Sequence, residues 1–418
     1  MTSGWAKVEA FPLEMSPDPA PEAQTGWAAI PWRSTPLYVI LASSLMGVMG
    51  VSLITPVLPD LRSVFAVSDA QVGLVITAYT LPGVLLTPFI GLFADRFGRR
   101  RVLIPLLFTF GIGGMGIAVA GSFTEVLVLR FVQGIGASAL VTLAVTMIGD
   151  FYDGRQRNAV MGFNASMLGT GAALYPLIGG VLAAVRWNAP FLFFGVGILV
   201  GVIATLALEE PDSERSTDAR VYLGRIRAVS LRPDALAIFA AITWIFFVFY
   251  GAVQTALPLL LNDEFGVEPS RIGVILAMVA LASAAVSSQY GRIAEWRTAP
   301  ELVALGFVAY GFSLLGIWAA PSPLFIAVAL LGFGVGFGIV MPSIDTTIIT
   351  LVSGELRAGM MGMRTSVLRL GQTIGPVGFT VVAESWYRST TAGYRELTVV
   401  AGVLTLVAGM IGYRSLRR

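Results

Sequence analysis

The sequence contains no cysteine and no histidine, and Lys7 is its only lysine. Disulfides, thiol nucleophiles, zinc sites and imidazole catalysis are therefore excluded. Charge is also scarce, since only 12% of the 418 residues are charged, whereas soluble chains carry roughly 25%. Because 56% of the residues are hydrophobic and the mean hydropathy is +0.80, the composition indicates a membrane protein.

The two halves of the chain repeat one another. A shift of 200 residues brings glycine, arginine and proline landmarks into register along most of each half. The matched pairs include Gly73 with Gly273, Gly134 with Gly334, Arg157 with Arg357, and Pro176 with Pro376. One shift that serves so many positions indicates two copies of one structural unit.

Twelve apolar runs are long enough to cross a bilayer, which takes about 20 residues each. They lie at 36–59, 71–94, 102–121, 124–149, 159–184, 188–208, 235–261, 271–291, 301–319, 323–350, 358–383 and 396–413. Each half of the chain holds six of them. The sequence therefore predicts an all-α membrane protein with twelve transmembrane helices in two six-helix repeats.

The domain boundaries and the orientation follow from polar segments. We expect a disordered cytoplasmic tail over 1–34, a six-helix bundle over 35–208, a cytoplasmic linker over 209–234 with a short surface helix at 221–229, and a second six-helix bundle over 235–418. Of the 27 basic residues, 19 fall on the side of the two termini and five on the other side. The positive-inside rule therefore predicts a multi-pass protein of the cell membrane with both termini in the cytoplasm.

The sharpest motif follows the second apolar run and reads Gly91-Leu92-Phe93-Ala94-Asp95-Arg96-Phe97-Gly98-Arg99-Arg100-Arg101. It resembles the signature loop of the major facilitator superfamily, and a degenerate second copy begins at Gly291. The resemblance covers residues 36 to 413. It implies the major facilitator fold and a secondary active transporter that works by alternating access.

A carboxylate beside an arginine cluster suits a gate that holds one conformation and breaks in the other. The resemblance implies that Asp95 faces the start of the eleventh span, where Asp150 and Arg357 join the same cluster. The expected gating residues are Gly91, Asp95, Arg96, Gly98, Arg99, Asp150 and Arg357. The alternative is a plain topology signal, and this alternative is favoured for Arg100 and Arg101.

Charges inside membrane spans are costly, so each is a functional hypothesis. Arg130, with Gln133 and Gly134 after it, resembles the span-four motif of the drug:proton antiporter branch, which ties this arginine to proton coupling. The alternative is an arginine that bonds backbone carbonyls. Asp345 is the only acidic residue well inside a span. It is the first candidate for a proton site, and the alternative is a permanent ion pair with Arg364.

Arg369 lies near the middle of its span and is a candidate anchor for an anionic substrate. It could instead bond neighbouring carbonyls. The remaining candidates for substrate binding are polar or aromatic residues within spans, namely Arg364, Gln133, Gln372, Asn164, Tyr250 and Gln254. Buried packing is the alternative for each of these side chains.

The fifth span resembles the glycine–proline motif of the antiporter branch, with Tyr175 in place of the glycine before the proline. Small residues allow close helix packing, and proline permits a kink. The expected hinge or packing residues are Gly171, Pro176, Gly179 and Gly180, and in the other half Gly375 and Pro376.

The sequence favours two functions, and a third class, a membrane sensor or enzyme on the same scaffold, has little support in it. The first is proton-coupled efflux of small amphipathic compounds, as in multidrug exporters. The second is uptake or exchange of a small organic anion, because the charges deep in the spans are three arginines and one aspartate. Neither involves an enzyme, a cofactor, a metal ion or nucleic acid. The expected partners are a small-molecule substrate, protons and the lipid bilayer, and the expected state is a monomer.

Overall fold

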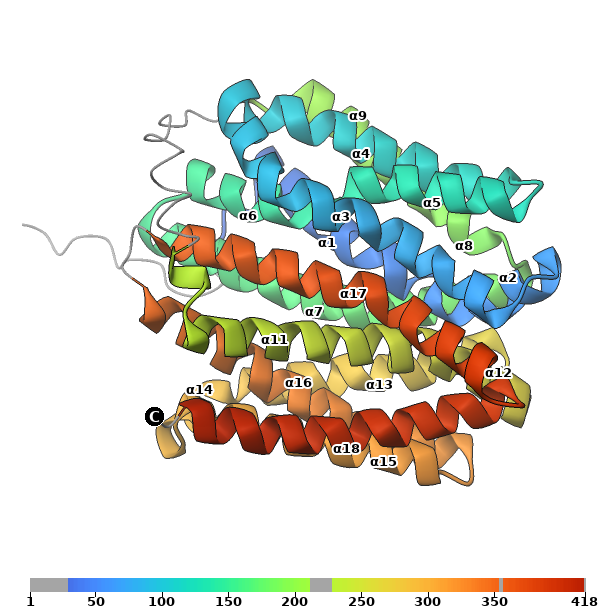
Figure 1. Cartoon of the computed structure of the whole chain (residues 1–418). Coiled ribbons are helices and arrows are strands. Elements are labelled where there is room, and N and C mark those ends of the chain that lie inside the picture. The colour runs from blue at the N-terminus through green and yellow to red at the C-terminus, as the bar shows by residue number, and fades with distance from the viewer. Residues whose placement is uncertain (1–28, 211–227, 353–355, 417–418) are drawn as a thin grey trace, which may run out of the picture.

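The computed structural model describes residues 29–210, 228–352 and 356–416. The regular elements of these residues are helices that run side by side along one direction (Figure 1). The first repeat consists of α1 (Thr35–Ser52), η2 (Thr55–Val57), α2 (Leu58–Phe65), α3 (Asp69–Phe97), α4 (Arg99–Gly116), η3 (Ile117–Val119), α5 (Phe123–Ala137), α6 (Leu140–Phe151), α7 (Gly154–Val185), α8 (Ala189–Leu192), η4 (Phe193–Gly195) and α9 (Val196–Ala207).

The second repeat follows the same plan. It consists of α11 (Pro233–Val248), the π-helix η5 (Phe249–Ala256), α12 (Leu257–Phe265), α13 (Pro269–Ser288), α14 (Tyr290–Trp296), α15 (Ala299–Ala319), α16 (Pro323–Leu351), α17 (Arg357–Trp386) and α18 (Thr390–Leu416). Helices α13, α15 and α16 each begin 200 residues after their counterparts α3, α4 and α5. The predicted all-α fold with two repeats is confirmed.

Local sequence fixes several of these helix starts. Ser68 caps α3, because its hydroxyl accepts the Gln71 backbone N–H while the Gln71 side chain accepts the Ser68 N–H. Thr298 and Glu301 form the same capping box at the start of α15. Such reciprocal caps satisfy amide groups that a helix start leaves without partners.

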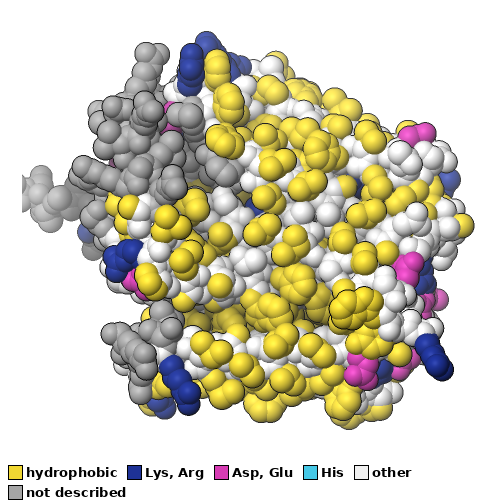
Figure 2. Space-filling model, in the orientation of Figure 1, with side chains coloured by type: hydrophobic (Ala, Val, Ile, Leu, Met, Phe, Trp, Pro, Cys, Tyr) yellow, Lys and Arg dark blue, Asp and Glu magenta, His cyan; other side chains and the backbone are white. Residues whose placement is uncertain are grey.

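Eleven helices of the described residues are long and apolar enough to cross a membrane, and they correspond to predicted spans one to ten and twelve. The twelfth is α17, which is 30 residues long. Its polar side chains, Arg364 and Arg369 among them, lower its hydropathy. Figure 2 shows hydrophobic side chains across most of the visible face, with charged side chains mainly at its two ends. This pattern fits a bilayer around the middle of the bundle.

We define the terminal face as the end of the bundle where α1 begins and α18 ends, and the opposite face as the other end (Figure 1). The predicted tail over 1–28 and the linker over 211–227, with most of the predicted helix at 221–229, lie outside the described residues. Residues 29–34, which the sequence places in the tail, are described and contact the first repeat. Ser34 Oγ lies 3.0 Å from the Tyr152 hydroxyl, and the Trp32 ring lies 5.2 Å from that of Phe163.

The two repeats pack most closely through α7 with α13 and through α3 with α17. Glycines allow this approach. A Cβ atom placed on Gly180 would lie 2.4 Å from the carbonyl oxygen of Pro269, and one on Gly273 would lie 2.2 Å from the carbonyl oxygen of Pro176. Both contacts lie in the half of the bundle nearer the opposite face, so the repeats are closed together there.

Candidate functional site

Arg130 is completely buried in α5. It donates three hydrogen bonds: Nε to the Val75 carbonyl at 3.1 Å, Nη1 to Gln133 Oε1 at 2.8 Å, and Nη2 to the Gly50 carbonyl at 2.8 Å. Its guanidinium carbon also lies 4.5 Å from the centre of the Tyr79 ring. The side chain therefore ties α5 to α3 and α1, as the carbonyl-bonding alternative for this arginine predicts.

Asp345 and Arg364 form an ion pair between α16 and α17. Arg364 Nε lies 2.5 Å from Asp345 Oδ1, and Arg364 Nη2 donates to Asp345 Oδ2 at 3.4 Å. The Asp345 side chain is 35% exposed and that of Arg364 is 16% exposed. The pair predicted from equal depth on neighbouring spans is present, and its carboxylate side chain is partly exposed.

Arg369 lies near the middle of α17, one turn before Thr373. Its Nη1 donates a long hydrogen bond of 3.4 Å to Gln372 Oε1, while its Nε is buried without a hydrogen-bond partner. Gln372 Nε2 in turn donates to the Tyr250 hydroxyl at 2.8 Å. Three predicted substrate-binding residues, Arg369, Gln372 and Tyr250, therefore meet in one place.

The π-helix η5 carries two of the predicted substrate-binding residues. Tyr250 and Gln254 both lie in it, and the wider turn of a π-helix is common at functional sites. Gln254 is buried. Asn164, on α7 of the other repeat, is also buried, and its side-chain oxygen has no hydrogen-bond partner among the described residues. Neither residue joins the contacts of Arg369 described above.

The signature loop forms an ion cluster within the first repeat. Arg99 bonds the Asp95 carboxylate through Nη1 and the Asp150 carboxylate through Nε, the latter at 3.0 Å. Gly98, between α3 and α4, has a φ of +102°, which a side chain would disfavour. The guanidinium carbon of Arg96 lies 5.8 Å from the centre of the Phe97 ring.

The predicted contact between Asp95 and the start of the eleventh span stays a prediction. Residues 353–355 and the side chain of Arg357 lie outside the described part of the structure. Gly91 lies within α3.

The glycines of the fifth and eleventh spans lie against neighbouring backbone. A Cβ atom on Gly179 would lie 1.9 Å from the Leu53 carbonyl oxygen, and one on Gly375 would lie 2.4 Å from that of Phe247. The other residues of the two motifs, Gly171, Pro176 and Pro376, lie within α7 and α17. These contacts support the packing interpretation of the motif.

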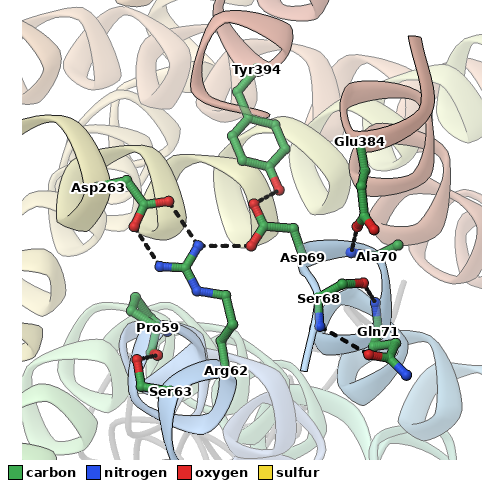
Figure 3. Close-up of polar contacts among 10 residues, drawn as sticks. All are labelled: Pro59, Arg62, Ser63, Ser68, Asp69, Ala70, Gln71, Asp263, Glu384 and Tyr394. Carbon is green, nitrogen blue, oxygen red and sulfur yellow. Dashed lines mark hydrogen bonds and ion pairs between the residues drawn. The ribbon is translucent and has the colours of Figure 1, made fainter. Parts of the chain in front are cut away.

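A cluster of charged and polar side chains at the opposite face was not predicted from the sequence (Figure 3). Arg62 donates to Asp69 at 2.7 Å within the first repeat and to both carboxylate oxygens of Asp263 in the second. Tyr394 donates to Asp69 at 2.9 Å, and Glu384 accepts the Ala70 N–H at 2.8 Å. The available signal was that positions 62 and 263, nearly equivalent in the repeat, carry opposite charges.

The hydrogen bonds between the repeats show which end is closed. Besides this cluster, Thr373 donates to the Thr80 hydroxyl at 3.0 Å, and Thr77 donates to the Thr373 carbonyl at 2.9 Å. Among the described residues, the hydrogen bonds that join the two repeats all lie between Thr373 and the opposite face. Arg369 is one turn closer to the terminal face. The structure is therefore a conformation closed at the opposite face.

Replacement of Arg62 by glutamine should weaken this closure. Arg62 bridges two carboxylates and is only 20% exposed, so we expect a loss of about 1 kcal/mol, more than a typical exposed ion pair contributes. The fraction of molecules open at the opposite face should rise about fivefold. Because the chain has no cysteine, spin labels at Val64→Cys and Glu268→Cys report the distance between the repeats.

The matched control is Arg271→Gln, which removes an exposed arginine at the same face. Its distance distribution should equal that of the protein with native Arg62 and Arg271. An Arg62→Gln distribution that also stays unchanged would show that the cluster does not hold the repeats together.

Comparisons with known proteins agree with this architecture. A family model described as the Major Facilitator Superfamily matches residues 40–255 and again 239–418. The bacillibactin exporter of Bacillus subtilis (strain 168) is 27% identical over 360 residues, covering 82% of this chain and 89% of that protein. The class C tetracycline resistance protein of Escherichia coli is 28% identical over 387 residues, covering 88% and 93%.

Solved structures share the fold. A bacterial homologue of the human lysosomal transporter Spinster, in an inward-facing and unoccupied conformation, has a TM-score of 0.78 at 18% identity, covering 92% of this chain and 97% of that one. The nucleoside transporter NupG has a TM-score of 0.76 at 11% identity, covering 92% and 99%.

Proposed function

The chain belongs to the major facilitator superfamily, and from this premise we propose that it exports small amphipathic compounds in exchange for protons. Family membership makes it a multi-pass membrane transporter of small molecules rather than an enzyme. Relatives named as exporters and resistance proteins support the outward direction. The observation that supports proton coupling is the partly exposed ion pair of Asp345 and Arg364.

The mechanism that we propose is alternating access. The repeats rock about a central site, and the carboxylate of Asp345 takes up a proton when that site faces the outside. Protonation removes the negative charge that holds Arg364, so the ion pair breaks. Helices α16 and α17 can then move relative to each other. Release of the proton on the other side restores the pair and resets the transporter.

We also propose the orientation and the gate. The terminal face is placed in the cytoplasm by the positive-inside rule, and the protein acts as a monomer in the plasma membrane. The cluster of Asp95, Arg99 and Asp150 would then lie at the cytoplasmic gate. It would contact the start of α17 when that side closes.

The Asp345→Asn variant tests proton coupling. Asparagine keeps the shape of the side chain but does not titrate, so proton-driven transport should fall at least about tenfold. Exchange of substrate across vesicles without a gradient should stay within about threefold of the native rate. We would measure both in proteoliposomes with an internal pH-sensitive dye, and add lipophilic cations, neutral amphiphiles and small carboxylates in turn.

The matched control is Asp153→Asn, which alters an exposed carboxylate before α7 and should leave both rates unchanged. Gradient-driven transport at the native rate in Asp345→Asn would refute the assignment of Asp345 as the proton site.

A further inference from the structure

The guanidinium groups deep in the bundle differ in their carboxylate partners and in the number of hydrogen bonds that they donate. Arg364 is neutralised by Asp345. Arg130 has three hydrogen bonds but, among the described residues, no carboxylate partner. Arg369 also has no described carboxylate partner, and it has only one long hydrogen bond, to Gln372. Its buried Nε has none. Arg369 is therefore the deep arginine with donors left to offer.

The side chains of Arg130 and Arg369 contact α3 on successive turns. Arg130 lies over the Tyr79 ring. A Cβ atom placed on Gly83, four residues later, would lie 3.1 Å from Arg369 Cδ. Tyr79 and Gly83 lie four residues apart, about 6 Å along the axis of α3. Positive charges within a membrane protein are costly without a counter-charge, and an anion bound beside Arg369 would supply one.

Aromatic side chains adjoin this position. The Tyr250 ring lies 5.6 Å from that of Phe249 and 6.2 Å from that of Phe246, and Phe337 packs against both phenylalanines. The Tyr250 hydroxyl accepts from Gln372, so its own proton is available for another acceptor. Arg369 and Tyr250 thus offer N–H and O–H donors next to apolar rings.

We propose that the transported compound is an aromatic anion, and that Arg369 and Tyr250 bind its carboxylate or phenolate group. The inference rests on the proposed function only in requiring a transported compound, since the same site serves export or uptake of an anion. The bonds of Thr373 to Thr80 and Thr77 close the bundle just beyond Arg369. In this conformation the anion therefore enters from the terminal face.

Three probes of one shape test the charge preference, namely 1-naphthoate, 1-naphthamide and 1-naphthylmethylammonium. Binding to the purified protein is measured by titration calorimetry, without any gradient, and empty micelles give the background. We expect 1-naphthoate to bind at least about tenfold tighter than the other two probes. Arg369→Gln should remove this preference, and Arg388→Gln, which alters an exposed arginine, should keep it.

A second variant keeps the test decisive if Arg369→Gln does not fold. Tyr250→Phe removes only the hydroxyl and should weaken 1-naphthoate about threefold or more, with no change for 1-naphthamide. Equal binding of the three probes, or a naphthoate preference that survives both variants, would overturn the assignment.

These experiments distinguish failure of the anion site from failure of the proposed proton-coupled export. Proton exchange driven by 1-naphthylmethylammonium, with no binding of 1-naphthoate, would leave a proton-coupled exporter and exclude the anion site. Binding of 1-naphthoate through Arg369, with normal gradient-driven transport in Asp345→Asn, would leave the anion site and exclude the proposed coupling.

Discussion

Replacement of Arg130 by lysine should reduce transport at least about 100-fold, although the positive charge is kept. The native side chain bonds acceptors on three helices at once, at Gly50, Val75 and Gln133. A lysine ammonium is a compact point charge that cannot reach all three in the geometry of the guanidinium fork. Hydrogen bonds from a charged donor contribute about 1.5–3 kcal/mol each. Losing two of them exceeds the about 2.7 kcal/mol that corresponds to a 100-fold change in rate.

The measurement is the initial rate of dye-reported proton movement in proteoliposomes. Arg101→Lys, an exposed position in the first turn of α4, is the matched control and should keep the native rate. Arg130→Met lacks both the positive charge and the guanidinium geometry. Its transport rate should therefore fall as far as that of Arg130→Lys. Transport within a few fold of native in Arg130→Lys, with loss in Arg130→Met, would show that the charge alone matters.

The fold could be predicted from the sequence because the sequence features that indicate it are local and occur in both halves. Span length, the shift of 200 residues and the glycine positions each constrain the same helices. The pairing of Asp345 with Arg364 was also predictable, because two opposite charges at equal depth on neighbouring spans have few other partners. The predicted contacts that involve residues outside the described ranges, such as that of Asp95 with the eleventh span, remain predictions.

The rest of the site depends on tertiary contacts that leave little trace in the sequence. The acceptors of Arg130 on α1 and α3 are backbone carbonyls, at Gly50 and Val75, which any residue type would supply. The pairing of Arg62 with Asp263 depends on how the two repeats sit together. The packing of the two repeats therefore determines which of these charges are neutralised.

The Gly180→Val variant should trap the transporter in a conformation open at the opposite face. A Cβ atom at this position would lie 2.4 Å from the Pro269 carbonyl oxygen, which belongs to the other repeat. Backbone cannot rotate away as a side chain can, so the closed conformation loses at least about 1–3 kcal/mol by overpacking. The open population should rise by roughly 5–150-fold, and transport should fall at least about tenfold.

Spin labels at Val64→Cys and Glu268→Cys should show a longer distance at the opposite face. Labels at Asn158→Cys and Ala294→Cys, exposed positions at the terminal face, should show a shorter one. Gly169→Val is the control on the same helix, because a Cβ atom there meets nothing within 4 Å. Native distances at both faces in Gly180→Val would contradict the closure described here.

Gly179 makes the test specific to the interface between the repeats. It adjoins Gly180 in α7, and a Cβ atom on it would lie 1.9 Å from the carbonyl oxygen of Leu53. Leu53 belongs to the same repeat as Gly179, so valine at 179 strains both conformations alike. Gly179→Val should therefore lower the thermal stability of the protein without shifting the balance between faces. Gly180→Val should shift that balance, because its contact exists only when the repeats are together.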